Sequence, residues 1–268
     1  MKRITLCADD YGMHPGVSEA ILELASQGSI HATSCLVTGR NWATQAKSLT
    51  TIQEKVDIGL HLNLTEGKGL SSSYMDSLPS LRQILIKSHF HLLNKTAVLE
   101  EVTAQYQNFI DTTGRAPDFV DGHQHVHHLP VVREALLSVI RSYKPGPSFW
   151  VRSVTPVIRH GGGLKSYIIE GSGSRSLHDQ LSNRGISSNA SFAGIYSLKP
   201  EENYSALMKS WLSDSYDRGL IMCHPGKTAE HNNLDHSQAR QSEFDYLSGQ
   251  QFVDDCQQAG VNLCRMRQ

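Results

Sequence analysis

The stretch Asp118-Phe119-Val120-Asp121-Gly122-His123-Gln124-His125-Val126-His127-His128 places four imidazoles and two carboxylates within eleven residues, around an apolar pair. Phe119 and Val120 predict the end of a buried strand. In an extended backbone, successive side chains alternate between faces, so His123, His125 and His127 would point the same way. Only neutral imidazole ligates a metal, and neighbouring imidazolium ions repel one another, so such a group suits a metal centre. The alternative is a polar loop that is merely rich in histidine.

The length and composition describe an ordinary globular protein. The 268 residues are enough for one large α/β domain. With 19% charged residues and a formal net charge of -1, the chain gives no electrostatic case for binding nucleic acid or an anionic membrane. The apolar run at the N-terminus is too short for a signal peptide, and no apolar run of about 18 residues occurs. We therefore expect a cytoplasmic protein that acts on a small molecule and does not insert into a membrane.

The five cysteines are scattered and form no CxxC pair, which predicts reduced, buried thiols. They are Cys7, Cys35, Cys223, Cys256 and Cys264.

Strand-like apolar runs alternate with helical patterns along most of the chain. Besides the His-rich stretch, we expect strands at 3–8, 30–38, 56–64, 149–154, 191–198, 220–223 and 261–264. Helices are expected at 15–28, 42–49, 98–114, after Pro130, at 201–218 and, as one long helix, at 237–258. This order predicts an α/β fold, a (β/α) barrel-like, distorted TIM-type barrel of about seven parallel strands with outer helices.

Two segments interrupt the regular pattern. Residues 68–95 carry a serine run and several histidines, and residues 161–188 are rich in glycine and serine. We interpret both as insertions in a single domain that spans residues 1–268, and the first as a cover over the mouth of the barrel.

Polar residues follow the apolar run of four expected strands. They are Asp9 and Asp10 after the first strand, His61 in the third, His123 in the His-rich stretch and His224 after Cys223. In a (β/α) barrel the carboxyl ends of the strands gather on one face, where the chemistry of such folds takes place. Each residue has a structural alternative: Asp9 and Asp10 can form a turn or a helix cap, His61 can be a hydrogen-bonded core residue, and His224 can cap a loop.

Asp10, His61 and His123 make a two-histidine, one-carboxylate set that leaves coordination positions open for water and substrate. A divalent cation there would polarise a carbonyl and lower the pKa of water towards about 7. On an ideal strand Asp9 and Asp10 face opposite ways, so the strand must turn at this point if both act. Asp9 could then accept the proton of the attacking water as general base, and His224 could donate one to a leaving amine.

Four strings resemble the signatures of the YdjC-like carbohydrate deacetylases, a family that includes chito-oligosaccharide deacetylases and a relative associated with hopanoid biosynthesis. The strings are Ala8-Asp9-Asp10-Tyr11-Gly12, Gly59-Leu60-His61-Leu62-Asn63-Leu64-Thr65-Glu66-Gly67, Asp121-Gly122-His123-Gln124-His125-Val126-His127 and Cys223-His224-Pro225-Gly226. The resemblance implies a barrel-like fold, a divalent metal (Mg²⁺ or Zn²⁺), a homodimer, and hydrolysis of the N-acetyl group of an amino sugar to acetate and an amine.

The resemblance also implies roles for single residues. Asp10, His61 and His123 would be the metal ligands, Asp9 the base and His224 the acid. His125 and His127 would line the substrate pocket or orient ligands from outside the metal's own shell.

Two other functions remain open from the sequence. One is a metal-dependent hydrolase of another bond, such as a phosphoester or a cyclic amide, because HxH patterns on barrel strands serve those reactions as well. The first strand ends in Asp-Asp and not in His-x-His, which favours the deacetylase. The other is a non-catalytic sugar-binding or metal-binding protein on the same scaffold.

Overall fold

The computed structural model describes residues 1–227 and 235–267. Its centre is one parallel sheet, in which the strands run in the order β5-β4-β3-β2-β1-β7-β6, with β8 paired to the start of β1. The strands are β1 (Lys2–Tyr11), β2 (Ala32–Cys35), β3 (Asp57–Leu62), β4 (Phe119–Gly122), β5 (Trp150–Val151), β6 (Phe192–Ala193), β7 (Gly219–Cys223) and β8 (Val261–Leu263).

The sheet curls into a half-barrel. Its two edges are β5 and β6, and each forms one isolated bridge to a residue outside the strands: Trp150 of β5 to Ser187, and Phe192 of β6 to Val157. The predicted (β/α) barrel-like fold is confirmed, although most strands are shorter than expected: only residues 32–35 of the run 30–38 pair, and β5 and β6 have two residues each.

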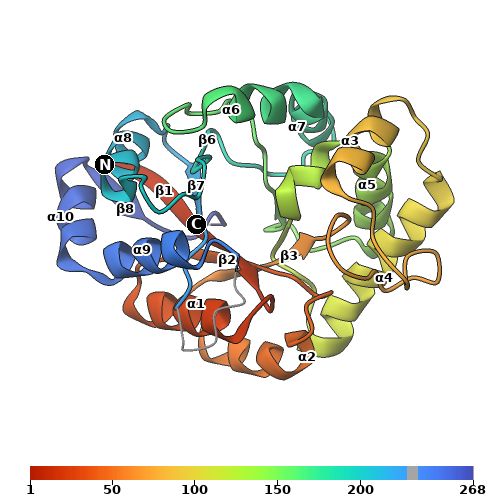
Figure 1. Cartoon of the computed structure of the whole chain (residues 1–268), viewed down its shortest axis with the longest axis horizontal. Helices are drawn as coiled ribbons and strands as arrows, with labels where there is room; N and C mark the ends of the chain where they lie inside the picture. Colours follow the sequence, from red (N-terminus) through yellow and green to blue (C-terminus); the bar gives the residue numbers. More distant parts are fainter. Residues whose placement is uncertain (228–234, 268) are drawn as a thin grey trace.

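Helices surround the outside of the half-barrel (Figure 1). They are α1 (Pro15–Gln27), α2 (Trp42–Gln45), α3 (Leu81–His89), α4 (Lys95–Thr113), α5 (Val132–Tyr143), α6 (Gly163–Ile169), α7 (Arg175–Ser182), α8 (Tyr204–Asp214), α9 (Ser237–Ser248) and α10 (Gln250–Gln258). Short helical turns are η1 (Ala46–Thr51), η2 (His123–His128) and η3 (Glu170–Ser174). None of the helices among the described residues has the length and apolar character needed to cross a bilayer.

Local sequence signals set the helix ends. Pro15 occupies the first turn of α1, the side chain of His14 accepts a hydrogen bond from the amide of Gly16, and Gly28 ends the helix with a φ of 80°. Helix α3 begins with a reciprocal capping box between Ser80 and Gln83. The single long helix expected at 237–258 is wrong, because Gly249 adopts extended dihedral angles (φ -92°, ψ 160°) and separates α9 from α10.

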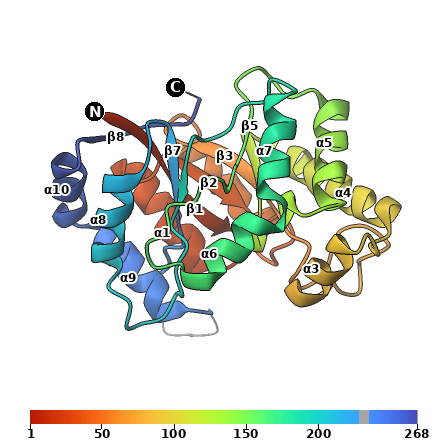
Figure 2. The ribbon, with the colours of Figure 1, turned by 90° about the horizontal axis from the view of Figure 1, so that it is seen from above.

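The two segments that interrupt the regular pattern fold into ordered elements. Residues 68–95 contain α3, and residues 161–188 contain α6, η3 and α7. In Figure 2, α3 and α6 lie on the side of the half-barrel opposite to both chain termini. Because β1 starts at Lys2, this is the side to which the carboxyl ends of the parallel strands point.

The sheet separates two apolar layers, because side chains of a strand alternate between its faces. On β7, Ile221 packs among the outer helices, whereas Leu220 and Met222 pack with the apolar residues inside the half-barrel. Phe119 and Trp150 belong to the inner layer, where their rings stack at a centroid distance of 4.0 Å.

Replacement of Phe119 by alanine is expected to lower the free energy of unfolding by about 3 to 5 kcal/mol, because the side chain is fully buried and its ring stacks on Trp150. Urea unfolding followed by circular dichroism measures the change. Leu99→Ala on α4 is the control, since Leu99 is 37% exposed, and its cost should stay within about 1 kcal/mol. Equal losses in the two variants would contradict the inner core assigned to Phe119.

Candidate active site

Four polar strand ends meet on one side of the half-barrel. Asp10 lies near the end of β1, His61 near the end of β3, His123 directly after β4 and His224 directly after β7. All four residues line one cavity of about 650 Å³, together with Asp9. The expectation that these residues converge from separate strands agrees with the structure.

The backbone turns at Asp10 in the way that the Asp-Asp pair requires. Asp10 has a φ of 72°, a left-handed conformation that aspartate adopts more readily than most residues. The pairing of β1 with β2 is irregular between Ala8 and Tyr11, which are the positions on either side of the pair. As a result Asp9 and Asp10, which would face opposite ways on a regular strand, both reach the cavity.

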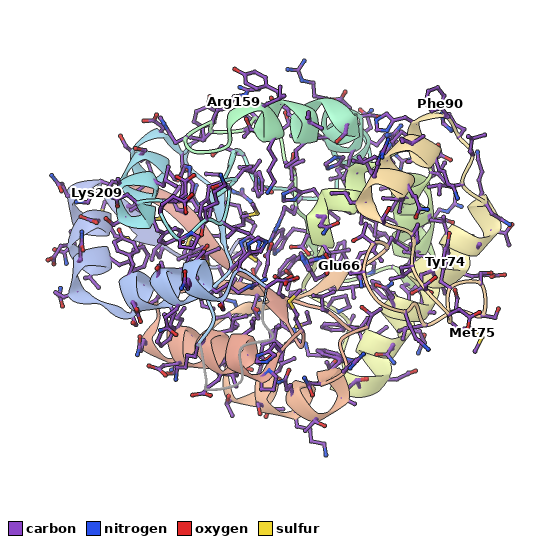
Figure 3. The ribbon with its side chains drawn as sticks, viewed as in Figure 1. Glu66, Tyr74, Met75, Phe90, Arg159 and Lys209 are labelled. Carbon is purple, nitrogen blue, oxygen red and sulfur yellow. The ribbon has the colours of Figure 1, made fainter. Side chains whose placement is uncertain are left out.

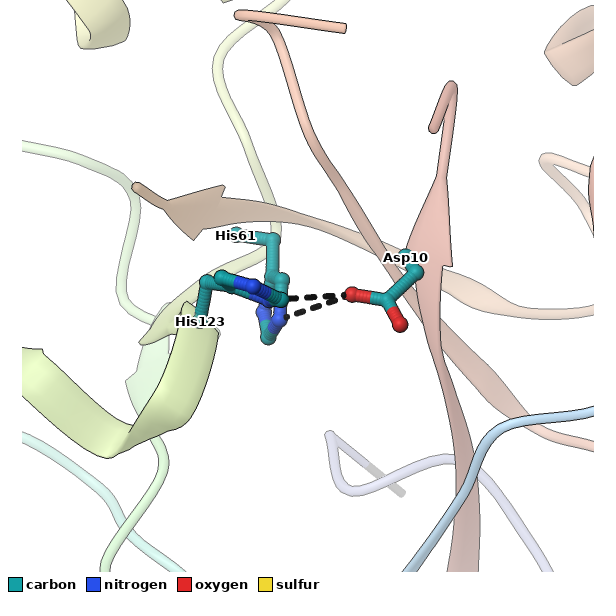
Figure 4. Close-up of side chains that lie close together, drawn as sticks. All are labelled: Asp10, His61 and His123. Carbon is teal, nitrogen blue, oxygen red and sulfur yellow. Dashed lines mark hydrogen bonds and ion pairs between the residues drawn. The ribbon is translucent and has the colours of Figure 1, made fainter. Parts of the chain in front are cut away.

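The carboxylate of Asp10 faces two imidazoles (Figure 4). Its Oδ1 lies 3.1 Å from Nδ1 of His123 and 3.5 Å from Nε2 of His61. Two atoms bound at ~2.1 Å to one ion lie roughly 3 to 3.5 Å apart in octahedral or tetrahedral coordination. The donor set and its spacing therefore fit a divalent cation, with all three ligand atoms within 4.8 Å of one another.

The second nitrogen of His61 is held by a buried carboxylate. Nδ1 of His61 lies 2.6 Å from Oδ1 of Asp121 and 3.0 Å from the hydroxyl of Ser34. Asp121 is the residue of β4 that pairs in register with His61 of β3. A carboxylate on the far nitrogen fixes the tautomer of an imidazole, so that Nε2 is left as the ligating atom.

A buried arginine joins Asp121 to Asp9. Both oxygens of Asp9 accept hydrogen bonds from the guanidinium of Arg152, at 2.7 Å and 2.6 Å, and Oδ2 of Asp121 lies 2.6 Å from the same group. Arg152 has no exposed surface. Burial alone would raise the pKa of Asp9, but the ion pair with Arg152 lowers it to about 2, so Asp9 is ionised at neutral pH.

A second arginine binds the other oxygen of Asp10. Nη2 of Arg240, from α9, lies 2.6 Å from Oδ2 of Asp10, which leaves Oδ1 to face the imidazoles. Burial would raise the pKa of Asp10, but Arg240 and the imidazoles hold it well below its usual range. Arg152, Arg240 and Asp121 were not among the site residues predicted from the sequence. The sequence offers one signal for Arg152 and Asp121: each is a charged residue in or next to an apolar strand. It offers no such signal for Arg240.

The charges of the site leave room for a cation. Among the residues that the structure describes, the buried carboxylates of Asp9, Asp10 and Asp121 pair with two guanidinium groups, one from each of two arginines. The half-exposed Glu66 lies 3.3 Å from Nε2 of His123. Burial opposes protonation of the imidazoles, yet the surrounding carboxylates raise the pKa of His61 to about 10 and also raise that of His123. Without a metal, the excess negative charge of the carboxylates thus favours protonation of the same two imidazoles that would ligate a metal. A divalent cation bound there would balance this charge in place of the protons.

The His-rich stretch is not extended, so the expectation that three imidazoles share one face is wrong. Residues 123–128 form the turn η2, with Gln124 and His125 in the left-handed region at φ 51° and 61°. His123 points to Asp10, and His125 lines the cavity with its ring edge-on to Phe192. His127 points elsewhere: its Nε2 lies 3.0 Å from the carbonyl oxygen of Arg152, and it is not among the residues that line the cavity.

His224 forms another part of the cavity wall. Its backbone amide donates a hydrogen bond of 2.6 Å to Glu243, and its Nδ1 is buried without a hydrogen-bond partner among the described residues. Burial lowers the pKa of His224 to about 4, so the imidazole is neutral at pH 7 in the resting protein.

The five cysteines form no disulfide among the described residues. Cys7, Cys35, Cys223 and Cys256 are buried, whereas Cys264 is half-buried.

The fold and the site define a half-barrel protein with a deep cavity, in which carboxylates and imidazoles gather at the strand ends. Residues 3–258 match the family described as YdjC-like protein, and the chain belongs to this family. It is 33% identical over 153 residues to a carbohydrate deacetylase of Mus musculus and 32% identical over 153 residues to one of Homo sapiens. Each match covers 53% of this chain, and 48% or 46% of the relative, so the match spans about half of these relatives.

A solved structure shares the whole fold. It is that of a candidate cellobiose-phosphate cleavage protein from Enterococcus faecalis V583, with a TM-score of 0.74 and 19% sequence identity. The match covers 99% of this chain and 97% of that one. It supports the half-barrel architecture alone.

Asp121→Asn is expected to weaken the binding of Zn²⁺ or Mg²⁺ by about 10- to 100-fold, because His61 would lose the carboxylate that orients it. Isothermal titration calorimetry measures the affinity. Asp118→Asn is the matched control: Asp118 also adjoins β4, but it binds Arg115 and the amide of Ile58, away from the cavity. The role of Asp121 would be refuted if both variants bound metal as tightly as the unmodified protein.

Proposed function

We propose that this protein is a metal-dependent carbohydrate deacetylase, which hydrolyses the N-acetyl group of an amino sugar to acetate and a free amine. Its membership of the YdjC-like family and its two relatives named carbohydrate deacetylase support the substrate class. The observation that carries the chemistry is the group of Asp10, His61 and His123 within 4.8 Å, with Asp9 in the same cavity.

Asp10, His61 and His123 are the proposed ligands of a divalent cation, Mg²⁺ or Zn²⁺. When bound, the cation would polarise the carbonyl of the acetamide and increase the acidity of water beside it. Three protein ligands leave positions open for both molecules. The homodimer and the cytoplasmic location expected from the sequence stay predictions.

Asp9 is the proposed general base. Its Oδ1 accepts hydrogen bonds from Arg152 and, at 3.1 Å, from the hydroxyl of Ser34, whereas Oδ2 has Arg152 as its one partner among the described residues. Oδ2 therefore keeps a lone pair that can accept a proton from an attacking water molecule. The ion pair keeps this carboxylate ionised and in a fixed orientation before substrate binds.

His224 is the proposed donor of a proton to the leaving amine. Because burial keeps its imidazole neutral at pH 7, His224 must gain a proton inside the cavity before it can donate one. The proton that Asp9 accepts from the attacking water would have to pass to His224, which lines the same cavity, and from His224 to the nitrogen of the leaving amine. With that transfer the reaction consumes no proton from bulk solvent. His125 lines the same cavity, where its imidazole would contact the sugar, and the proposed role of His127 is limited to supporting β5 through the carbonyl of Arg152.

The test is release of acetate from N-acetylated chito-oligosaccharides and other N-acetyl sugars by the purified protein, with added Mg²⁺ or Zn²⁺ and after treatment with EDTA. We expect acetate with metal and none after chelation. Release of phosphate from phosphoesters, or tight metal binding without turnover of any acetylated sugar, would overturn the proposal in favour of another hydrolase or a binding protein.

Asp9→Asn is expected to retain metal binding but to lower kcat by about 10²- to 10⁴-fold, because the amide cannot accept the proton of water. Calorimetry with metal and an acetate assay on the same sample separate the two effects. Cys7→Ala is the control: Cys7 contacts Asp9 at 3.6 Å but does not line the cavity, so a change of less than about tenfold is expected. Undiminished activity of Asp9→Asn would remove the base assignment.

A further inference from the structure

One buried carboxyl group of α9, that of Glu243, lies outside the cavity and outside the proposed reaction. Its side chain has no exposed surface, and none of the arginines, lysines or histidines that the structure describes forms an ion pair with it. Burial raises the pKa of Glu243 to about 7, although its hydrogen bonds and the charge of Arg240 act in the opposite direction. A carboxyl group is costly to bury without a cation, and such groups are typical of functional sites.

The two oxygens of Glu243 bind two residues that line the cavity. Oε1 accepts a hydrogen bond of 2.5 Å from the hydroxyl of Tyr196, and Oε2 accepts one of 2.6 Å from the backbone amide of His224. Tyr196 and His224 line the cavity, and they follow the neighbouring strands β6 and β7. One side chain of α9 thus joins two strand ends from behind the cavity wall.

Arg240, one turn earlier on α9, contacts the same segment. Its Nη1 lies 3.4 Å from the carbonyl oxygen of His224, and its Nη2 lies 2.6 Å from Oδ2 of Asp10. Both polar groups of the His224 backbone are therefore held by α9, the amide through Glu243 and the carbonyl through Arg240. In Figure 3, α9 lies between α10, which is at the edge of the molecule in Figure 1, and the middle, where Glu66 of the cavity wall is labelled.

The position of the His224 ring depends on these backbone contacts. Nδ1 of His224 is buried without a partner among the described residues, so no bond at that nitrogen orients the ring. A proton donor acts from a heavy-atom distance of about 2.6 to 3.2 Å, and a displacement of about 1 Å can lower the rate about 100-fold. A side chain that only filled the space behind β7 would not need two hydrogen-bond acceptors.

We propose that Glu243 is a positioning residue: with one oxygen on Tyr196 and the other on the amide of His224, it holds the imidazole of His224 where it can protonate the leaving amine. Tyr196 in turn fixes the orientation of the carboxyl group. This inference rests on the proposed function, since it concerns the proton donor of that reaction.

The test is a double-mutant cycle of Glu243→Met and His224→Ala in the acetate assay. Methionine keeps the volume of the side chain but accepts neither hydrogen bond, so kcat is expected to fall by about 10- to 100-fold. KM should change by less than about threefold, because Glu243 does not line the cavity. In the His224→Ala background, Glu243→Met is expected to change kcat by less than about twofold, because the residue that it positions is absent.

Two further variants separate positioning from packing. Glu243→Gln is expected to keep kcat within about threefold, because a carboxamide can accept the hydrogen bond of the His224 amide and donate one to the oxygen of Tyr196. Tyr246→Phe is the matched control: Tyr246, also on α9, donates a hydrogen bond of 2.8 Å to Asp255, and neither residue lines the cavity. Its kcat should change by less than about twofold. If Glu243→Met does not fold, Tyr196→Phe takes its place in the cycle, with an expected loss of about three- to tenfold that also requires His224.

Hydrogen exchange of the His224 amide, followed by NMR, provides a readout without turnover. Glu243→Met is expected to speed this exchange by at least about tenfold, and Tyr246→Phe should leave it unchanged. Unchanged exchange, or an equal loss of kcat with and without His224, would overturn the inference and leave the deacetylase intact. If the unmodified protein releases no acetate, the deacetylase proposal fails by itself, and the exchange rate still decides whether Glu243 holds His224.

Discussion

The ion pairs of Arg152 determine the geometry of the whole site. One guanidinium, without exposed surface, binds Asp9 of β1 and Asp121 of β4 from a position directly after β5. A buried carboxylate without a cation would be protonated or would draw in water, and neither form would hold a fixed orientation. Arg152 therefore does two things at once: it keeps Asp9 ionised beside the cavity, and it holds the carboxylate of Asp121 in the position from which it contacts His61.

Asp10 depends on a second, separate arrangement. Its left-handed backbone brings it to the same cavity as Asp9, and Arg240 then occupies Oδ2 and leaves Oδ1 towards the imidazoles. The two adjacent aspartates are thus each bound by a different arginine, one from the end of β5 and one from α9. The two arginines leave different acceptors available on the neighbouring carboxylates. Asp10 keeps Oδ1 for the imidazoles, whereas Asp9, with both oxygens bound to Arg152, keeps a lone pair of Oδ2.

The sequence predicted a barrel-like parallel sheet and the convergence of Asp10, His61 and His123, because both follow from the period of strands and from the rule that parallel strand ends share a face. It did not predict Arg152 or Arg240, because their importance comes from contacts with Asp9 and Asp10 that span 143 and 230 positions along the chain. The shape of the His-rich stretch was also wrong, since the alternation of side chains holds only while the backbone stays extended. Gln124 and His125 adopt left-handed backbone conformations, and neither is a glycine or an asparagine, the residue types from which such a turn could have been predicted.

The burial of the site and the strength of its ion pairs depend on one another. Electrostatic interactions between Arg152, Asp9 and the imidazoles are strong only where water is scarce, because water screens charges far more than protein does. Arg152 and Asp121 have no exposed surface, and Asp9, Asp10 and His61 are at most 2% exposed. The curled sheet that keeps water from these groups therefore also strengthens the ion pairs that hold them in place. Loss of one partner would leave a buried charge uncompensated, so each of these charged residues depends on the others for its ionised, oriented state.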